Sequence, residues 1–242
     1  MNGIELYGAR ADGVSISIAD TGAPLSGADL VGSTWTGVLS NGNTVALRVD
    51  DARQGTGTNA DVWSYRFSIS ADGLWRPLCL EHAGNEGFAD TVRGTWNLER
   101  GVPGGGSYHP DAPQFTVACR GYAIAKCVEL GYKPWTGHAR ELAACVRAMR
   151  ADYCGDGTPY TVDGTLIDIY DQAGVQIDDQ DWVPEAAGTP EGASCVSKKT
   201  ATRFWQVAHQ TPSCYPHALK PENSCGTEFS DGVAIITELP PL

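Results

Sequence analysis

Residues 115–132, FTVACRGYAIAKCVELGY, and residues 138–157, HARELAACVRAMRADYCGDG, decide how this chain folds. The first segment reads as a short apolar helix, and the second carries an apolar stripe at helical spacing. Gly131 and Gly155 lie near the positions where the two helices would end. No other part of the chain carries helical signals, so the sequence predicts a single helical hairpin, with helices near residues 120–130 and 136–152.

Two pairs of cysteines accompany this hairpin. The first segment holds Cys119 and Cys127, and the second holds Cys145 and Cys154. If the two segments run antiparallel, Cys127 lies opposite Cys145 near the turn, and Cys119 lies opposite Cys154 at the open end. The spacing therefore favours two disulfide bridges across the hairpin.

The chain has eight cysteines, an even number, as a complete disulfide set requires. The other four are Cys79, Cys195, Cys214 and Cys225. The pairs Cys79–Cys119 and Cys154–Cys195 would serve as well as Cys119–Cys154, because sequence alone cannot select among about 105 connectivities. Disulfides persist in the periplasm and outside the cell, which indicates an exported protein. A complete set would leave no thiol as a nucleophile.

The rest of the chain reads as β-structure and loops. Residues 1–78 contain alternating segments such as Trp63–Ile69, and Asn41-Gly42 is typical of a hairpin turn. Residues 81–113 are rich in glycine and proline and read as a long loop or lid. We therefore expect an α+β fold with an antiparallel β-rich body, one inserted helical hairpin and a disulfide-stapled, loop-rich C-terminal part. We assign residues 1–78 to the β-rich part and residues 79–242 to the rest, packed together as one unit.

Strand signals return after the second helix. Thr165–Tyr170 and Val175–Ile177 read as a hairpin around Gly174, and Val233–Thr237 reads as a closing strand. The sequence thus predicts a second β-region in the C-terminal part.

The charge balance excludes one class of partner. The chain has 29 acidic and 17 basic side chains, a formal net charge of -12. Nucleic acid is not an expected partner, since phosphate binding needs clustered lysine and arginine.

No apolar stretch of the sequence approaches a membrane span in length. No export signal is visible at Met1, so we expect an export segment to have been removed, and the precursor is either soluble or held by a lipid anchor.

A candidate cation loop follows the second helix. Asp152, Asp156, Gly157 and Asp163 partly match the loop of EF-hand proteins, in which alternating oxygen donors and a glycine bend surround calcium. Cys154 occupies the third position of that pattern, which departs from it. The alternative is a helix end followed by ordinary turns built on aspartate and glycine.

Two histidines lie in the predicted loop beside carboxylates. His82 follows Glu81 and His109 precedes Asp111 by two positions, so either histidine is a candidate general base of a hydrolase. A histidine beside an acid is also common by chance, and no nucleophile elbow, phosphate-binding loop or zinc spacing occurs. The sequence assigns no catalytic residue, and a non-enzymatic role is favoured.

The chain also has seven tryptophans. Trp182, beside Asp181, and Trp135 are candidates for stacking on a sugar ring. Large aromatic side chains more often fill protein cores, which is the alternative.

The run from Cys145 through Ala151-Asp-Tyr-Cys154 to Gly157, followed by Thr161–Thr165, resembles the ADYC domain, which is named for that tetrapeptide. Further matching stretches are Trp75–Cys79, Phe115–Gly121, Lys126–Cys127, Gly131–Trp135 and Gly192–Cys195. The resemblance covers most of residues 60–230. It implies an exported, often lipid-anchored protein of myxobacteria and their relatives, and it carries no catalytic residue over to this chain.

We expect from these features an exported, disulfide-stabilised domain at the cell surface, in the periplasm or outside the cell. The leading hypothesis is a non-enzymatic module that binds a protein or a glycan. A hydrolase using His82 or His109 is the enzymatic alternative. A calcium-stabilised matrix or assembly protein is the third.

Overall fold

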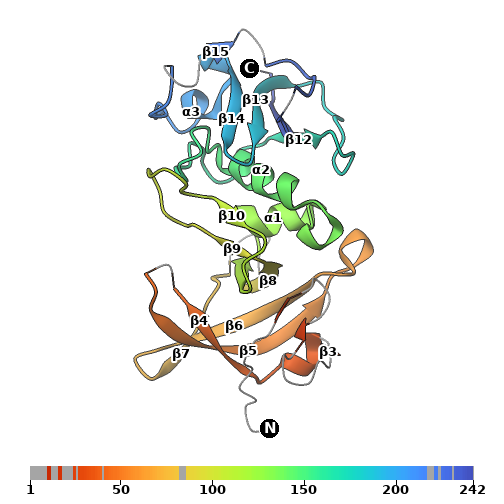
Figure 1. Cartoon of the computed structure of the whole chain (residues 1–242), viewed down its shortest axis with the longest axis vertical. Helices are drawn as coiled ribbons and strands as arrows, with labels where there is room; N and C mark the ends of the chain where they lie inside the picture. Colours follow the sequence, from red (N-terminus) through yellow and green to blue (C-terminus); the bar gives the residue numbers. More distant parts are fainter. Residues whose placement is uncertain are drawn as a thin grey trace. The chain divides into compact units, whose positions relative to one another are not determined.

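The computed structural model of the chain divides into two compact units (Figure 1). It describes residues 10–11, 16–17, 24–25, 27–39, 41–81, 86–216, 221–222, 225–230 and 232–241. Unit 1 comprises the described residues up to Thr95, together with His109–Glu129 and Lys133–Trp135. Unit 2 comprises Trp96–Tyr108, Leu130–Tyr132 and the described residues from Thr136 onward.

Unit 1 is built on a six-stranded antiparallel sheet. Five strands lie in the order β11 (Phe115–Cys119), β8 (Phe88–Arg93), β6 (Trp63–Ala71), β5 (Thr44–Gln54) and β4 (Thr34–Val38). The sixth, β7 (Leu74–Pro77), pairs with the end of β6. Because β8 and β11 join strands from the N-terminal part, the first unit extends beyond residue 78, where we had expected a boundary.

The turns of this sheet follow the sequence. Asn41-Gly42 connects β4 to β5, with Gly42 at φ +82° and the Asn41 side chain accepting a hydrogen bond from the Asn43 N–H at 3.0 Å. Asp72-Gly73 connects β6 to β7, and both residues have positive φ. Positive φ at both central positions of Asp72-Gly73 matches the right-handed twist of paired strands. At the other turn only Gly42 has positive φ, and its N–H donates to the Leu39 carbonyl at 2.9 Å. The predicted hairpin at Asn41-Gly42 is confirmed.

The core of unit 1 lies on one face of this sheet, around Trp35. Its ring contacts Phe67 with centroids 5.4 Å apart and Phe115 with centroids 5.6 Å apart. Trp35 belongs to β4 and Phe115 to β11, at opposite ends of the strand order, so the sheet curls until its two ends meet across the core. The indole N–H donates to the Ser33 hydroxyl at 2.8 Å, which leaves no buried donor unsatisfied on this ring.

Shorter elements complete the first part of the chain. They are β1 (Arg10–Ala11), β2 (Ile16–Ser17) and β3 (Pro24–Leu25), which form a small antiparallel sheet, the 3-10 turns η1 (Gly27–Leu30), η2 (Gly57–Asn59) and η3 (Pro134–Thr136), and the helix α1 (Ala123–Glu129). Within unit 1, α1 packs against β8 and β11.

Unit 2 is a five-stranded sheet covered by a helix. The strands lie in the order β12 (Asp168–Asp171), β16 (Ile235–Leu239), β13 (Val183–Thr189), β14 (Gly192–Ser197) and β15 (Pro221–Glu222). The pairing is antiparallel except between β14 and β15. The helix α2 (Ala139–Arg150) packs against β13, β14 and β16. The unit also contains the turn η4 (Lys199–Ala201) and the short helix α3 (Arg203–Gln206). The strands β9 (Thr95–Trp96) and β10 (Tyr108–His109) pair with each other, and each has one residue in either unit.

The two predicted helices are observed inside their predicted ranges, at residues 123–129 and 139–150, whereas the short helix α3 at Arg203–Gln206 was not predicted. The chain is thus mostly antiparallel sheet with few helices, as an α+β assignment implies. None of the helices in the described ranges is long and apolar enough to cross a membrane.

The hairpin predicted around Gly174 is wrong. β12 pairs with β16 from the end of the chain, and no strand forms at residues 175–177. The Asp171 carboxylate accepts hydrogen bonds from the N–H groups of Val175 and Gln176, at 3.2 and 2.7 Å. These bonds close a turn in place of a strand ladder. The predicted closing strand is confirmed as β16.

All eight cysteines are disulfide-bonded. The bridges with described geometry are Cys79–Cys119, Cys154–Cys214 and Cys195–Cys225. The expected Cys119–Cys154 bridge is therefore wrong, as is the alternative Cys154–Cys195, whereas the alternative Cys79–Cys119 is confirmed. Cys127 and Cys145 are bonded as well, and because the other six cysteines pair among themselves, the expected Cys127–Cys145 bridge is the one that remains.

Candidate binding site

The Ala151–Cys154 tetrapeptide is the junction between helix α2 and the sheet of unit 2. Ala151 takes a left-handed conformation, φ 52°, and its N–H bonds to the Ala148 carbonyl, which ends the helix. The Tyr153 hydroxyl donates to the Glu185 carboxylate on β13 at 2.6 Å. Cys154 is bonded to Cys214. Each of these residues thus fixes where the chain goes after the helix.

Behind the tetrapeptide lies a buried ion pair. Arg203 and Glu185 are 1% and 0% exposed, with 2.8 Å between the guanidinium and the carboxylate. Burial alone would raise the pKa of Glu185, but the Arg203 charge and the hydrogen bonds from Arg203 and Tyr153 outweigh it and lower that pKa. The guanidinium also donates to the last carbonyls of α2, at Ala148 (2.7 Å) and Met149 (3.3 Å).

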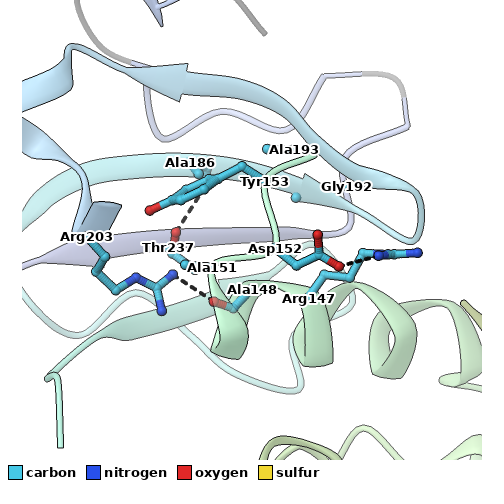
Figure 2. A pocket seen from close by; sticks show the side chains of 11 residues that line it. Arg147, Ala148, Ala151, Asp152, Tyr153, Ala186, Gly192, Ala193, Arg203 and Thr237 are labelled. Carbon is cyan, nitrogen blue, oxygen red and sulfur yellow. Dashed lines mark hydrogen bonds and ion pairs between the residues drawn. The ribbon is translucent and has the colours of Figure 1, made fainter. Parts of the chain in front are cut away.

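A small cavity adjoins this ion pair (Figure 2). Its volume is about 20 Å³, which is room for one water molecule. Arg203 and Tyr153 already bond to protein groups within it. The cavity is thus a packing defect of the core, too small for a substrate.

The predicted cation loop is organised differently from an EF-hand. Asp152 is 3% exposed, and its carboxylate accepts hydrogen bonds from the Arg147 guanidinium and from the Asp156 and Gly157 N–H groups. The Asp156 carboxylate accepts from the Thr158 N–H at 2.9 Å. Within the described part of the chain, the carboxylates of Asp152, Asp156 and Asp163 do not form a converging group. Arg147 supplies the positive charge that Asp152 needs.

A shallow concavity of this unit lies beside the Cys154–Cys214 bridge. Its volume is about 370 Å³, and it is open to solvent. The lining residues are Gly101, Val102, Pro103, Cys154, Gly155, Asp156, Ser213 and Cys214. We call it the bridge hollow. It offers apolar surface, one carboxylate and one hydroxyl.

The walls of the bridge hollow are held rigidly. The Gly101 N–H donates to the Asp156 carbonyl at 2.9 Å, and Arg147 donates to the Gly105 carbonyl at 3.1 Å. A Cβ atom at Gly105 would lie 2.2 Å from the Asp156 carbonyl oxygen, so only glycine permits this approach. Residues 101–106 therefore form a fixed wall. This part of the predicted loop is held in place by hydrogen bonds and close packing, unlike a lid that moves freely.

Trp135, Trp182 and His109, which were predicted from the sequence, are not among the residues that line this hollow. The Trp135 indole donates to Asp61 at 2.8 Å, a packing role, and Trp182 is half-buried near the end of the sheet. His109 is exposed, and Asp111 lies 3.9 Å from Arg93. His82 lies outside the described residues.

Sequence reasoning missed Val102, Pro103 and Ser213 as site residues. Ser213 is more than a hundred positions from Val102 along the chain, and the Cys154–Cys214 bridge joins the two walls. The Cys154–Cys214 pairing, if known, would have identified Ser213 as a site residue, because it places residue 213 next to the tetrapeptide.

One perturbed carboxyl group lies in unit 1, away from any described hollow. Asp90 is completely buried, and it accepts a hydrogen bond from the Ser64 hydroxyl at 2.6 Å. Burial raises its pKa to about 7, and the nearby Glu129 charge adds to that effect. Its second oxygen has no hydrogen-bond partner in the described structure. The folded protein therefore keeps Asp90 protonated in a pH range where the unfolded chain ionises it.

Asp90→Asn is expected to stabilise the protein at pH 8 by about 1–2 kcal/mol. Because the folded-state pKa is raised, the wild-type contribution is present at low pH and is lost as the pH rises toward 7. The asparagine keeps the Ser64 hydrogen bond and never ionises. Urea unfolding at pH 5 and pH 8 measures this difference. Equal gains at both pH values would contradict it.

Comparison with known proteins supports the resemblance found in the sequence. No curated relative and no solved structure matches the chain. A family model described as the ADYC domain matches residues 27–202, a range that includes the tetrapeptide, α2 and the whole six-stranded sheet of unit 1. Since this match spans nearly three quarters of the sequence, the chain belongs to the ADYC domain family.

Proposed function

We propose that this protein is an exported, non-enzymatic binding module that holds one saccharide unit in the bridge hollow. The observation that carries the proposal is the hollow itself, whose volume of about 370 Å³ falls within the range of small-molecule sites. A disulfide set that uses every cysteine suits an oxidising compartment, which supports export. The precursor would reach the cell surface, free or lipid-anchored.

The chemistry of the lining suits a sugar ring. Saccharides present C–H faces and hydroxyl groups side by side, so they need apolar and polar partners together. Val102 and Pro103 provide apolar contact, and Ser213 provides a hydroxyl. Asp156 uses one oxygen for the Thr158 N–H, which leaves acceptor capacity for sugar hydroxyls.

The fixed walls support binding further. A site that is ordered before the ligand arrives costs less conformational entropy on binding. The hydrogen bonds of Gly101 and Gly105 hold one wall, and the Cys154–Cys214 bridge holds the other. The hollow is also too small for a protein–protein interface of standard size, which favours a glycan over a protein partner.

The lining favours binding over hydrolysis. Glycoside hydrolysis commonly needs two carboxyl groups, and among the described residues one, that of Asp156, lines the hollow. None of the histidines in the described part of the chain lines it to activate the Ser213 hydroxyl.

Val102→Glu is expected to weaken saccharide binding at least tenfold, roughly 1.4 kcal/mol, because it places a charge on the apolar wall. Labelled protein on a panel of immobilised saccharides identifies the ligand, and calorimetry measures the affinity of each variant. Leu98→Glu is the matched control, since Leu98 is also apolar and exposed on the same segment but lies outside the lining. The proposal fails if no saccharide is retained, or if both variants bind equally.

A further inference from the structure

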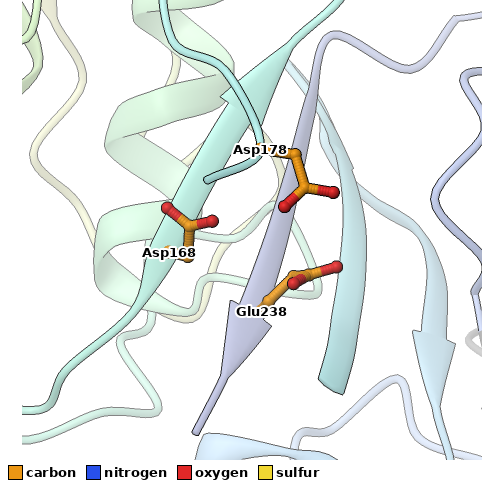
Figure 3. Close-up of side chains that lie close together, drawn as sticks. All are labelled: Asp168, Asp178 and Glu238. Atoms are coloured by element: carbon orange, nitrogen blue, oxygen red, sulfur yellow. The ribbon is translucent and has the colours of Figure 1, made fainter. Parts of the chain in front are cut away.

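Three acidic side chains converge at the edge of the sheet of unit 2, away from the bridge hollow. Asp168 on β12 lies directly opposite Glu238 on β16 in the strand register. Asp178 reaches the same place from the connection after β12 (Figure 3). One oxygen from each of these residues lies within 4.8 Å of the others. We call this group the acidic triad.

The triad contains buried oxygens without partners. Glu238 is 2% exposed, and one of its oxygens accepts a hydrogen bond from the Tyr170 hydroxyl at 3.0 Å. Its other oxygen is buried and has no hydrogen-bond partner in the described structure. The same is true of one oxygen of Asp168, whose second oxygen accepts from the Ile169 N–H at 2.8 Å. A buried, unpaired acceptor carries a desolvation cost that a ligand would remove.

The negative charge of the triad is also uncompensated. None of the ion pairs found in the described ranges involves these three residues. Like charges directly opposite each other on paired strands destabilise a sheet. Without a cation, repulsion between the three carboxylates therefore lowers the stability of the folded protein, and a bound cation would offset this loss.

We propose that Asp168, Asp178 and Glu238 bind a calcium ion. All three donors are carboxylate oxygens, which hard cations prefer over the nitrogen and sulfur ligands typical of zinc. Two oxygens bound to one Ca²⁺ at about 2.4 Å can lie up to about 4.8 Å apart, which accommodates the observed spacing. Magnesium demands a tighter and more regular octahedron.

The position of the triad shows what the ion would join. It would tie β12, the last strand β16 and the connection that contains Asp178, which are separate stretches of the chain. Asp178 is exposed, so the remaining coordination positions face solvent and are available to water. The calcium site differs from the Asp152–Asp163 loop, in which Arg147 already neutralises Asp152.

Calorimetric titration of the EDTA-treated full chain with CaCl₂ tests the site. Three carboxylates and an open side predict a dissociation constant on the order of 0.1–1 mM, the range of extracellular modules. Asp178→Asn is expected to weaken calcium binding at least tenfold, and because Asp178 is exposed, this substitution should leave folding intact. Glu238→Gln keeps an acceptor for the Tyr170 hydroxyl and is expected to have the same effect.

Asp163→Asn is the matched control, an exposed aspartate in the other candidate loop, and it should bind calcium as the wild type does. A melting temperature that rises with CaCl₂ in the wild type and in Asp163→Asn, but not in Asp178→Asn, would support the site independently. The proposal is overturned if the wild type binds no calcium, if Asp178→Asn binds like the wild type, if Asp163→Asn abolishes binding, or if magnesium binds equally well.

Discussion

Arg203→Met is expected to lower the free energy of unfolding by about 3–5 kcal/mol, among the largest effects of any single substitution in this protein. Arg203 and Glu185 are both completely buried, so removing the guanidinium leaves the Glu185 charge without its partner. The same change removes the hydrogen bonds to the Ala148 and Met149 carbonyls, which cap the C-terminus of helix α2. The variant would thus lose the contacts by which one side chain joins the end of α2 to Glu185 on β13.

Urea unfolding under oxidising conditions measures this loss. Arg100→Met is the control, because Arg100 is exposed and its replacement should change stability by less than about 0.5 kcal/mol. The double variant Glu185→Gln/Arg203→Met should recover at least half of the loss, since the buried charge is gone and the new amide oxygen can still accept from the Tyr153 hydroxyl. Equal effects of Arg203→Met and Arg100→Met would show that the ion pair contributes nothing to the fold.

Replacing Cys154 and Cys214 together by alanine is expected to lower the free energy of unfolding by about 4 kcal/mol. The bridge closes a sequence separation of 60 residues, and the entropy that it removes from the unfolded chain grows with that length. The bridge also forms one wall of the bridge hollow, so saccharide affinity should fall with it.

The Cys79→Ala/Cys119→Ala variant separates these two effects. That bridge lies in unit 1 and closes a separation of 40 residues, so its loss should lower stability by a similar amount, about 4 kcal/mol. Saccharide binding to the folded fraction should stay at the wild-type level. The interpretation of the hollow fails if both double variants lose affinity equally, and the stability estimate fails if the Cys154/Cys214 variant unfolds at the wild-type urea concentration.

Local features of the fold were predictable, because they depend on neighbouring residues. The helices follow from apolar spacing over a few turns, and the Asn41-Gly42 hairpin follows from a dipeptide that tolerates positive φ. The β12 pairing was missed for the opposite reason. Its partner, β16, lies more than sixty residues further along the chain, and no local signal distinguishes that pairing from a hairpin around Gly174.

The bridge hollow and the acidic triad were even harder to predict, because both form through contacts between residues far apart in the sequence. The bridge hollow required the Cys154–Cys214 bond, which is one choice among many connectivities. Asp168 and Glu238 become neighbours only through the register of β12 and β16, although each is an ordinary acid in the sequence. Asp152 carried a partial cation motif, yet Arg147, one helical turn earlier, is its partner. In that segment the motif did not reveal the ion pair with Arg147.

The route of the chain between the two units has a practical consequence for dissecting this protein. Residues 96–108 belong to unit 2, whereas the strand that follows, β11, completes the sheet of unit 1. A fragment that stopped at Thr95 would lack β11 and would leave Cys79 as an unpaired thiol. A fragment that began at Thr136 would lack Gly101 and Gly105, which bond to Asp156 and Arg147. Neither half can be excised by a single cut, so the whole chain is the smallest piece worth expressing, exchanging or fusing.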